Sequence, residues 1–260
     1  MPSNGLHILV TNDDGVQAPG LLALKNGLLD LGEVTVLAPL RNWSASGHVK
    51  TMHKPLRVEE VMLADGTAAL ATDGAPSDAV ALAFLGIVER KIDLVVAGIN
   101  RGPNLGHDLT YSGTVTAAME GTLSGAPSIA FSLASYSLED FSAAAGFAER
   151  LVCTTWQHGL PANTLLNVNI PALPADEIKG VLVTRTGDRI YRDELIRRTD
   201  PRGTPYYWIG GPPPEGREDQ GTDIWAVANG YISVTPIQLD LTAHSFLPTV
   251  EGWELTLDQD

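Results

Sequence analysis

Two adjacent carboxylates follow the first apolar segment of the chain. Residues 8–10 form a short apolar run with β-branched character, which predicts a buried strand, and Asp13 and Asp14 come soon after it. Like charges this close repel each other, and burial adds to the cost unless a cation lies between them or one takes up a proton. Carboxylate oxygens are ligands that Mg²⁺ or Mn²⁺ prefers. Residues 12–15 also fit a solvated turn or a helix cap, so this segment alone leaves both interpretations open.

Two more oxygen donors fall after predicted strands. Ser44 lies in a polar loop behind the strand that ends at Pro39, and Asn100 follows the strand predicted over 92–97. Ligands of an open α/β sheet bind beyond the carboxyl ends of its strands, so we expect these side chains at one edge. Taken singly, Ser44 is an ordinary loop serine and Asn100 a turn residue; their shared location favours a metal site. The predicted ligands of one Mg²⁺ or Mn²⁺ per subunit are Asp13, Asp14, Ser44 and Asn100, and Asp13 and Asp14 are the candidate catalytic groups.

A possible anion site begins the helix that contains Val115 and Met119. Ser112, Gly113 and Thr114 come first in this helix. Backbone N–H groups and hydroxyls gather at a helix N-terminus, where they suit a phosphate. A simple helix cap explains the same residues, and the neighbouring metal site favours the phosphate.

The order of the predicted elements indicates an α/β fold. Pro19 opens a helix of regularly spaced leucines up to about Gly32, and strands are predicted over 34–37, 92–97, 127–133 and 165–168. A β excursion is expected over 55–72, and helices from Pro76 to Val88 and over 138–158. Regular alternation of strands and helices favours a parallel, doubly wound sheet. We therefore predict a catalytic core over residues 1–175.

The regular alternation of strands and helices does not continue in residues 176–260. We interpret this region as a β arm, closing strands and a tail. Residues 180–186 and 206–209 are strand-like and flank a charged stretch, which predicts a protruding arm; 231–235 is a further strand. A lone hairpin is only marginally stable in water, so we expect a homodimer or homotetramer formed through this region. Apolar residues of the tail also need a surface to pack on: Leu247, Val250, Trp253, Leu255 and Leu257.

Composition limits the possible partners. The chain has 260 residues, with 17 basic and 31 acidic side chains and a net charge of −14. Nucleic-acid polymers need basic patches, so we expect none as a partner. Cys153 is the only cysteine, which favours a reducing compartment, and no apolar run is long enough for a membrane span. We expect a cytoplasmic protein that binds no membrane.

Several segments together resemble the SurE (survival protein E) family of metal-dependent nucleotidases, over about residues 5–245. The segments that carry the resemblance are Leu9–Gly15, Ala38–Pro39 with Arg41, Asn42 and Ser44, Gly98–Gly106, Tyr111–Val115, Ala117–Gly121, Asp200–Gly203 with Tyr207 and Trp208, Gly221–Asp223, Thr235–Pro236 and Asp240–Thr242. Leu40, Trp43 and Ala45 depart from the usual family pattern, and none of them is a metal ligand.

The resemblance implies a fold, an activity and a set of site residues. The fold is a Rossmann-like three-layer α/β/α arrangement whose C-terminal β elements serve in oligomers. The activity is hydrolysis of nucleoside 5′- or 3′-monophosphates, in some members also of short-chain polyphosphate. By position, the metal ligands fall on the four residues named above. The phosphate contacts fall on Asn104, Ser112, Gly113 and Thr114.

Two other classes of protein remain as alternatives. A regulatory binding module that accepts a phosphoryl group or senses a nucleotide also has an acidic pair after its first strand. It needs a lysine at the end of a later core strand, which the predicted strands lack. A dinucleotide-dependent oxidoreductase needs G-x-G-x-x-G after the first strand, and residues 12–15 do not match it.

Overall fold

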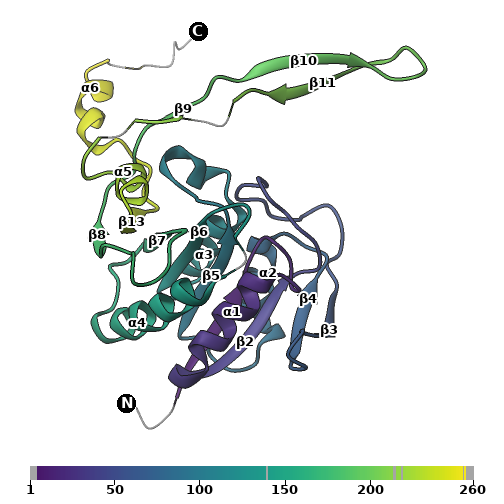
Figure 1. Cartoon of the computed structure of the whole chain (residues 1–260), viewed down its shortest axis with the longest axis vertical. Helices are drawn as coiled ribbons and strands as arrows, with labels where there is room; N and C mark the ends of the chain where they lie inside the picture. Colours follow the sequence, from purple (N-terminus) through teal and green to yellow (C-terminus); the bar gives the residue numbers. More distant parts are fainter. Residues whose placement is uncertain (1–4, 139, 213–214, 218, 254, 256–260) are drawn as a thin grey trace.

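A mostly parallel sheet organises the chain. The computed structural model describes residues 5–138, 140–212, 215–217, 219–253 and 255. Its described residues form a nine-stranded sheet in the order β3-β4-β2-β1-β5-β6-β7-β13-β8 (Figure 1). Strands β4 to β7 of this order run parallel. Strand β3 is antiparallel to β4 and β13 is antiparallel to β7, whereas β8 pairs parallel with β13. The strands are β1 (Leu6–Thr11), β2 (Gly32–Pro39), β3 (Val58–Met62), β4 (Ala68–Thr72), β5 (Leu94–Arg101), β6 (Ser128–Ala134), β7 (Thr164–Pro171), β8 (Val181–Val183) and β13 (Ile232–Gln238).

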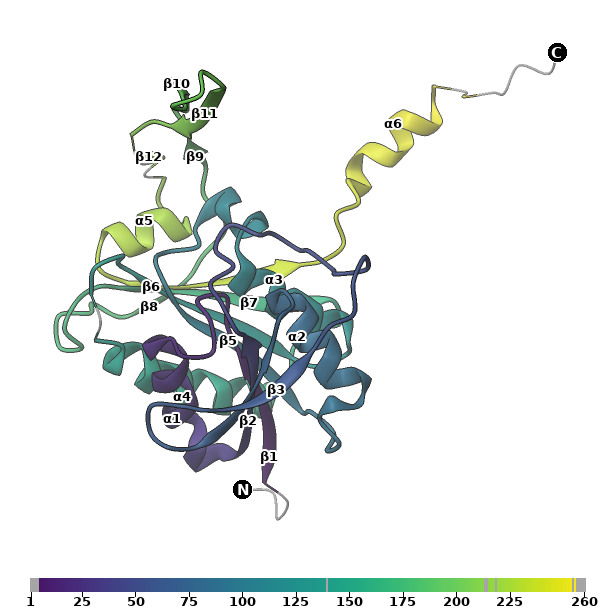
Figure 2. The same cartoon turned by 90° about the vertical axis from the view of Figure 1, so that its right-hand side faces the viewer.

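Helices cover both faces of the sheet. Helices α1 (Pro19–Leu28) and α4 (Ser142–His158) pack on one face, and α2 (Pro76–Leu82) and α3 (Gly113–Leu123) pack on the other (Figure 2). Strand β1 contributes to both hydrophobic cores, because Ile8 and Val10 belong to the cluster under α1 and α4 and Leu9 belongs to the other. Alternate side chains of a strand point to opposite faces, which explains its continuous apolar run. The predicted Rossmann-like, three-layer α/β/α fold is confirmed.

Local sequence features account for the helix boundaries near the site. Pro19 occupies the first turn of α1, as predicted, and Leu21, Leu24 and Leu28 are fully buried. Gly20 lets α1 lie directly on β5, since a Cβ there would be 2.1 Å from the carbonyl oxygen of Ile99. Short helical turns follow or precede the longer helices: η1 (Leu29–Leu31), η2 (Ala83–Ile87), η3 (Gly106–Thr110) and η4 (His244–Phe246).

The start of one predicted helix is wrong. The helix predicted over 138–158 begins only at Ser142, with Phe141 as the residue before its first turn, and residue 139 lies outside the described part. Ser135 accepts hydrogen bonds from the backbone N–H groups of Ser137 and Leu138. A serine hydroxyl that binds nearby backbone groups favours a turn, so the chain turns here before it enters α4.

The C-terminal third contains a hairpin that projects from the body. Strands β10 (Glu194–Thr199) and β11 (Pro205–Gly210) pair antiparallel and form what we call the arm (Figure 1). At its base lie the short strands β9 (Arg189–Ile190) and β12 (Glu215–Gly216). Helix α5 (Asp223–Ala228) precedes β13, and the hydroxyl of its N-cap Thr222 accepts a hydrogen bond from Trp225 N.

The predicted strands of the arm are partly wrong. Residues 180–186 supply β8 of the main sheet and no strand of the arm, and the charged stretch itself forms β10. The two arginines of this strand stand opposite tyrosines of β11, Arg197 opposite Tyr207 and Arg198 opposite Tyr206. The Arg197 guanidinium is 5.9 Å from the centre of the Tyr207 ring, a cation–π contact that favours the pairing.

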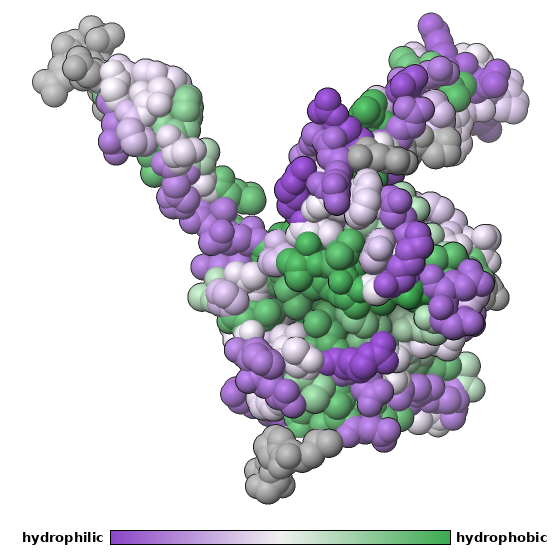
Figure 3. All heavy atoms as spheres, turned by 60° about the vertical axis from the view of Figure 1, so that its left-hand side comes forward, coloured by the Kyte–Doolittle hydropathy of each residue, from purple (hydrophilic) through white to green (hydrophobic). Residues whose placement is uncertain are grey.

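The tail is a second projection. Helix α6 (Leu247–Glu251) leads away from the body, and both projections flank an apolar area on the body's surface (Figure 3). Leu247, Trp253 and Leu255 are exposed, Val250 is half-buried, and Leu257 lies outside the described residues. No helix in the described part of the chain has both the length and the apolar character needed to cross a membrane.

Candidate active site

Five of the predicted site residues line one cavity at the carboxyl edge of the sheet. The parallel strands β1, β2 and β5 all end at this edge, and the residues that follow them form the walls. The cavity, which we call the edge cavity, has a volume of about 350 Å³. The predicted residues that line it are Asp13, Ser44, Asn100, Asn104 and Ser112. The structure thus brings these five residues together, while Asp14, Gly113 and Thr114 are not among the residues that line this cavity.

Asp13 is the most buried acid of the edge cavity. Its side chain follows the buried end of β1, and the residue is only 3% exposed. The hydroxyl of Thr114 donates a hydrogen bond to its Oδ1. Burial raises the pKa of Asp13 to about 6, and the charge of Asp14 adds to this, whereas the Thr114 hydrogen bond lowers it. A cation close to this carboxylate would offset the cost of burying its charge.

Gly113 presents its backbone to the same carboxylate. A Cβ at this position would lie 2.6 Å from Cβ and 2.8 Å from Oδ2 of Asp13. Only glycine therefore lets the first turn of α3 approach Asp13 this closely. Ser112 is the N-cap, and its Oγ accepts a hydrogen bond from Val115 N at 3.1 Å. The predicted helix start at these residues is confirmed, and the Ser112 hydroxyl proton remains available to an acceptor in the cavity.

Asp14 borders a neighbouring cavity of about 410 Å³, which Arg41 and Arg101 also line. Its carboxylate accepts hydrogen bonds from Asn42 Nδ2 at 3.3 Å and from Arg101 N at 3.0 Å. Burial raises its pKa, and the backbone and charge of Arg101 oppose that effect. Arg101 lines both cavities, so Asp13 and Asp14 border two neighbouring cavities that share this residue in their walls.

The loop that carries Ser44 is anchored on both sides of the cavity. Trp43 N donates to the backbone oxygen of Asp13 at 2.7 Å. Further along, Nε2 of His48 lies 3.0 Å from the carboxylate of Glu120 in α3. The pKa of Glu120 is lowered, mainly by this contact with His48. Backbone and side-chain contacts thus fix the loop between β1 and α3, with Ser44 at the cavity.

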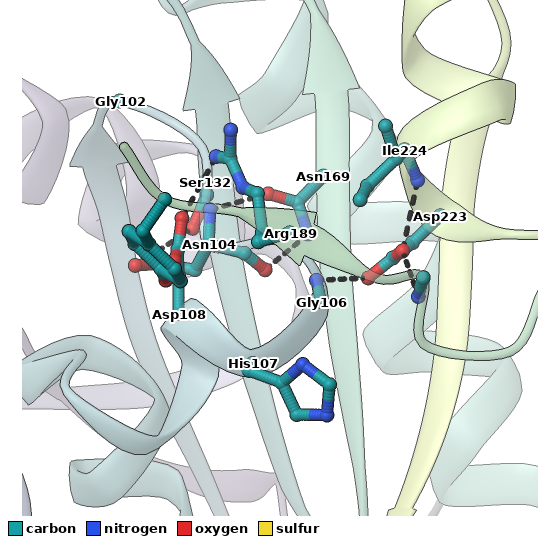
Figure 4. A network of polar contacts seen from close by, with 12 residues as sticks. Gly102, Asn104, Gly106, His107, Asp108, Ser132, Asn169, Arg189, Asp223 and Ile224 are labelled. Atoms are coloured by element: carbon teal, nitrogen blue, oxygen red, sulfur yellow. Dashed lines mark hydrogen bonds and ion pairs between the residues drawn. The ribbon is translucent and has the colours of Figure 1, made fainter. Parts of the chain in front are cut away.

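Asn100 and Asn104 lie on one loop that leaves β5. The pairing of β5 with β6 shifts register between Ala97 and Asn100, which turns the end of the strand. Asn100 Nδ2 donates to Gly102 O at 2.9 Å, so Oδ1 is its oxygen for a cation. Asn104 N donates to Asn169 Oδ1 at 2.8 Å, and Asn104 Nδ2 donates to Ser132 Oγ at 2.8 Å (Figure 4). Side chains of β6 and β7 thus fix the loop through hydrogen bonds to Asn104.

Sequence reasoning missed a set of residues that join this loop to the base of the arm. Asp108, in η3, lines the edge cavity and accepts from Arg189 at 2.8 Å and from the hydroxyl of Tyr191, which lines the cavity as well (Figure 4). The fully buried Asp223 accepts from the N–H groups of Gly106 and Gly187, both at 2.8 Å. The Thr222-Asp223 pair is typical of a helix start, and Thr222 does cap α5, but such a local pattern gives no sign of these distant partners.

The predicted donor set, three of whose members line the edge cavity while Asp14 lines its neighbour, suits a hard divalent cation. The described residues contain no group of three or more His, Cys, Asp and Glu side chains that could hold a metal. A site of two carboxylates, one hydroxyl and one amide oxygen lies below that count and still offers oxygen ligands throughout, as Mg²⁺ and Mn²⁺ prefer. The buried Oδ1 of Asn12, beside Asp13, has no hydrogen-bond partner among the described residues. The residues present therefore fit such a cation.

Comparisons with known proteins agree with this geometry. A family model described as Survival protein SurE matches residues 8–193. The chain belongs to the SurE family. A family member named 5′-nucleotidase SurE from Herpetosiphon aurantiacus is 57% identical over 239 residues, which cover 91% of this chain and 94% of the relative. The 5′-nucleotidase SurE of Chloroflexus aggregans is 53% identical, over 96% of this chain and 99% of the relative. A crystal structure of the SurE protein from Aquifex aeolicus matches with a TM-score of 0.82 at 43% identity, covering 96% of this chain and all of that one.

Proposed function

We propose that this chain hydrolyses the phosphate ester of nucleoside 5′- and 3′-monophosphates, releasing nucleoside and phosphate. The observation that carries the proposal is the nearly buried carboxylate of Asp13, which faces one cavity together with hydroxyl and amide groups of three loops. The names of the SurE relatives support the substrate class. Short-chain polyphosphate is a second substrate class in this proposal.

The proposed cofactor is one Mg²⁺ or Mn²⁺ per subunit, bound by Asp13, Asp14, Ser44 and Asn100. When bound, such a cation polarises a phosphoryl oxygen and lowers the pKa of a bound water. The fixed orientation of Asp13, held by Thr114 and Gly113, supports its role as a ligand. A carboxylate that serves as a ligand is less free to attack phosphorus, which favours water as the nucleophile.

Asn104, Ser112, Gly113 and Thr114 are the proposed phosphate contacts. The first turn of α3 offers backbone N–H groups and a positive dipole end to an anion. The hydroxyl and the backbone N–H of Thr114 both contact the carboxylate of Asp13, so Thr114 would bind the phosphate beside this acid. The Ser112 hydroxyl can donate while its oxygen caps the helix. These donors would also stabilise charge that develops on the phosphoryl group.

The test is phosphate release from a panel of 5′- and 3′-monophosphates with Mg²⁺, with Mn²⁺ and with EDTA. We expect repeated turnover with either metal, loss in EDTA and loss in Asp13→Asn. Asp30→Asn is the matched control, because Asp30 is an exposed acid of η1 on another element. Stoichiometric phosphorylation of the chain without turnover would support the regulatory module instead. Hydrolysis that is unchanged in EDTA and in Asp13→Asn would contradict the metal site.

We also propose that the chain forms a homodimer or homotetramer through the arm and the tail. Both projections carry exposed apolar side chains, among them Leu195, Trp208, Ile209 and Trp253. The apolar area of the body between the two projections (Figure 3) offers a surface for a second copy. The single cysteine supports a cytoplasmic location.

A further inference from the structure

The edge cavity is lined by polar and by aromatic side chains. Its polar residues include Asp13, Ser44 and Asn100, which are proposed cation ligands. Three tyrosines line the same cavity: Tyr111, Tyr136 and Tyr191. Their exposed fractions are 62%, 75% and 44%, so each ring keeps much of its surface free. Exposed aromatic rings are costly to leave in water, and three of them at one cavity point to a flat apolar ligand.

Tyr191 is held in place by a clamp at the base of the arm. Its hydroxyl donates to Asp108 Oδ1, and Arg189 lies 2.8 Å from Oδ2 of the same carboxylate. Burial and the hydrogen bond to Asp108 raise the pKa of Tyr191 to about 12, so the hydroxyl stays a donor at neutral pH. The ring is thereby oriented before any ligand arrives, which reduces the entropy lost on binding.

The other two rings are positioned by the loops that carry the polar groups. Tyr136 follows β6, and its ring lies against Gly102: a Cβ on Gly102 would be 2.3 Å from Cε1 of Tyr136. Tyr111 directly precedes the N-cap Ser112, and its backbone oxygen accepts from Gly47 N at 2.9 Å, next to the Ser44 loop. The three rings thus come from three segments: Tyr111 adjoins Ser112, Tyr136 lies against Gly102 in the loop between Asn100 and Asn104, and Tyr191 binds Asp108.

We infer that Tyr111, Tyr136 and Tyr191 form the subsite for the nucleobase, in which at least one ring stacks on the base while the phosphate lies among the polar residues of the cavity. This inference rests on the proposed nucleotidase function. A cavity of about 350 Å³ falls within the range of small-molecule sites. Stacking tolerates every base because each has a flat π face, and a purine overlaps a ring more than a pyrimidine does. The subsite therefore accepts all bases and favours purines. It also needs Tyr191, which belongs to the C-terminal third.

The experiment compares AMP with ribose 5-phosphate, which has the same phosphate ester and sugar but no base. We expect Tyr136→Leu and Tyr191→Leu each to lower the ratio of kcat/KM for AMP over ribose 5-phosphate about tenfold, mostly through KM for AMP. UMP should lose less than AMP. Tyr136→Phe keeps the ring and should keep the wild-type ratio. A purely structural role of the side chain would instead lower kcat/KM for AMP and for ribose 5-phosphate alike, and so leave the ratio unchanged in the leucine variant. An equal loss on both substrates, or no loss in either leucine variant, would overturn the subsite.

A binding measurement separates this inference from the proposed function. Calorimetric titration of the protein with AMP and with ribose 5-phosphate, in EDTA, measures the two binding affinities without turnover. Their difference gives the contribution of the base. If the wild-type chain hydrolyses neither compound, the proposed function fails. The subsite is then judged by AMP binding alone: a loss of about tenfold in affinity in Tyr136→Leu, reversed in Tyr136→Phe, supports it, and equal affinities in all three proteins refute it.

Discussion

The hydroxyl of Thr114 donates a hydrogen bond to the carboxylate of Asp13, and so joins the first turn of α3 to the end of β1. The contact bridges 101 positions of the chain. It aims one carboxylate oxygen at the helix, while the backbone of Gly113 covers the other oxygen. The position of the principal acid is therefore set by the helix that also carries the proposed phosphate contacts.

Gly113→Ala should displace Asp13 and impair catalysis. The added Cβ would lie 2.6 Å from Asp13 Cβ, a distance at which something must shift. A misplacement of about 1 Å can cost about 100-fold in rate, so we expect a loss of that order in kcat/KM together with weaker Mn²⁺ binding. Gly146→Ala in α4 is the control, since its Cβ would meet only Arg150, at 3.9 Å. Wild-type kinetics in a folded Gly113→Ala protein would refute the close packing.

Asp13→Asn should stabilise the metal-free protein above pH 6. Folding raises the pKa of Asp13 from 3.8 to about 6, so between these values the folded state keeps a proton that the unfolded chain has lost. The unfolding free energy of the metal-free wild type therefore falls as the pH rises through this window, by up to about 3 kcal/mol, and levels off above it. The asparagine carries no charge, so this pH-dependent fall in unfolding free energy should disappear in the variant. A smaller dependence on pH should remain because burial also raises the pKa of Asp14.

Urea denaturation in EDTA at several values between pH 4 and pH 8 measures this effect. Asp30→Asn, an exposed substitution, should follow the wild-type profile. Identical profiles for the wild type and Asp13→Asn would show that the buried carboxylate costs the fold nothing.

Ser112→Ala and Thr114→Val should separate phosphate binding from metal binding. The Thr114 hydroxyl contacts Asp13, so we expect Thr114→Val to weaken Mn²⁺ binding as well as kcat/KM, by about tenfold each. Ser112 caps α3, and no hydrogen bond joins its side chain to Asp13 among the described residues, so Ser112→Ala should lower kcat/KM with Mn²⁺ affinity within about twofold of wild type. Calorimetry with Mn²⁺ beside steady-state kinetics distinguishes the two. Equal losses of Mn²⁺ affinity in both variants would contradict this division.

Local patterns in the sequence were enough to group the polar residues of the site. The apolar run of β1 ends at Asn12 to Gly15, and the carboxyl ends of parallel strands must share one edge, so Asp13, Ser44 and Asn100 could be grouped without coordinates. The partners of Thr114 could not be predicted. The sequence places it at a helix start, but which acceptor its hydroxyl takes depends on how closely α3 approaches β1.

The contacts at the base of the arm could not be predicted from the sequence either, because they also depend on how distant segments pack. Asp108 binds Arg189 and Tyr191, and Asp223 binds Gly106, across gaps of more than 80 positions that leave no periodic signal. The charged stretch forms β10 although its residues stay exposed, and its arginines pair across the strands with tyrosines of β11. Strand preference depends on such neighbours across the sheet more than on the residue types alone.

Asp223→Asn should destabilise the fold and loosen the edge cavity. The buried carboxylate accepts from Gly106 N, Gly187 N and Ile224 N, each at 2.8 Å. An asparagine turns an NH₂ group toward one side of this set, so we expect a loss of about 2–4 kcal/mol in unfolding free energy and a lower kcat/KM. Thr222→Ala, which removes only the cap of the same helix, should cost about 1 kcal/mol and leave kcat/KM close to wild type. Urea titrations and kinetics of the two variants together test the link, which fails if both behave alike.

Removal of the arm should change the state of assembly. Strands β10 and β11 pair only with each other among the described residues, and an isolated two-stranded hairpin is marginally stable in water. We therefore expect the full chain to be at least a dimer, and a chain in which a short Gly-Ser linker replaces residues 194–210 to form a smaller assembly. A third protein, truncated before Leu247, tests the tail separately.

Multi-angle light scattering at micromolar concentration reads all three proteins, and circular dichroism confirms that each is folded. If the arm holds subunits together, its removal lowers the measured mass while the truncation isolates what the tail adds. Arg197→Ala serves as a milder probe, because it removes the contact with the Tyr207 ring and leaves the strand in place. A full chain that scatters as a single species near its 27.6 kDa monomer mass would rule out assembly through either projection.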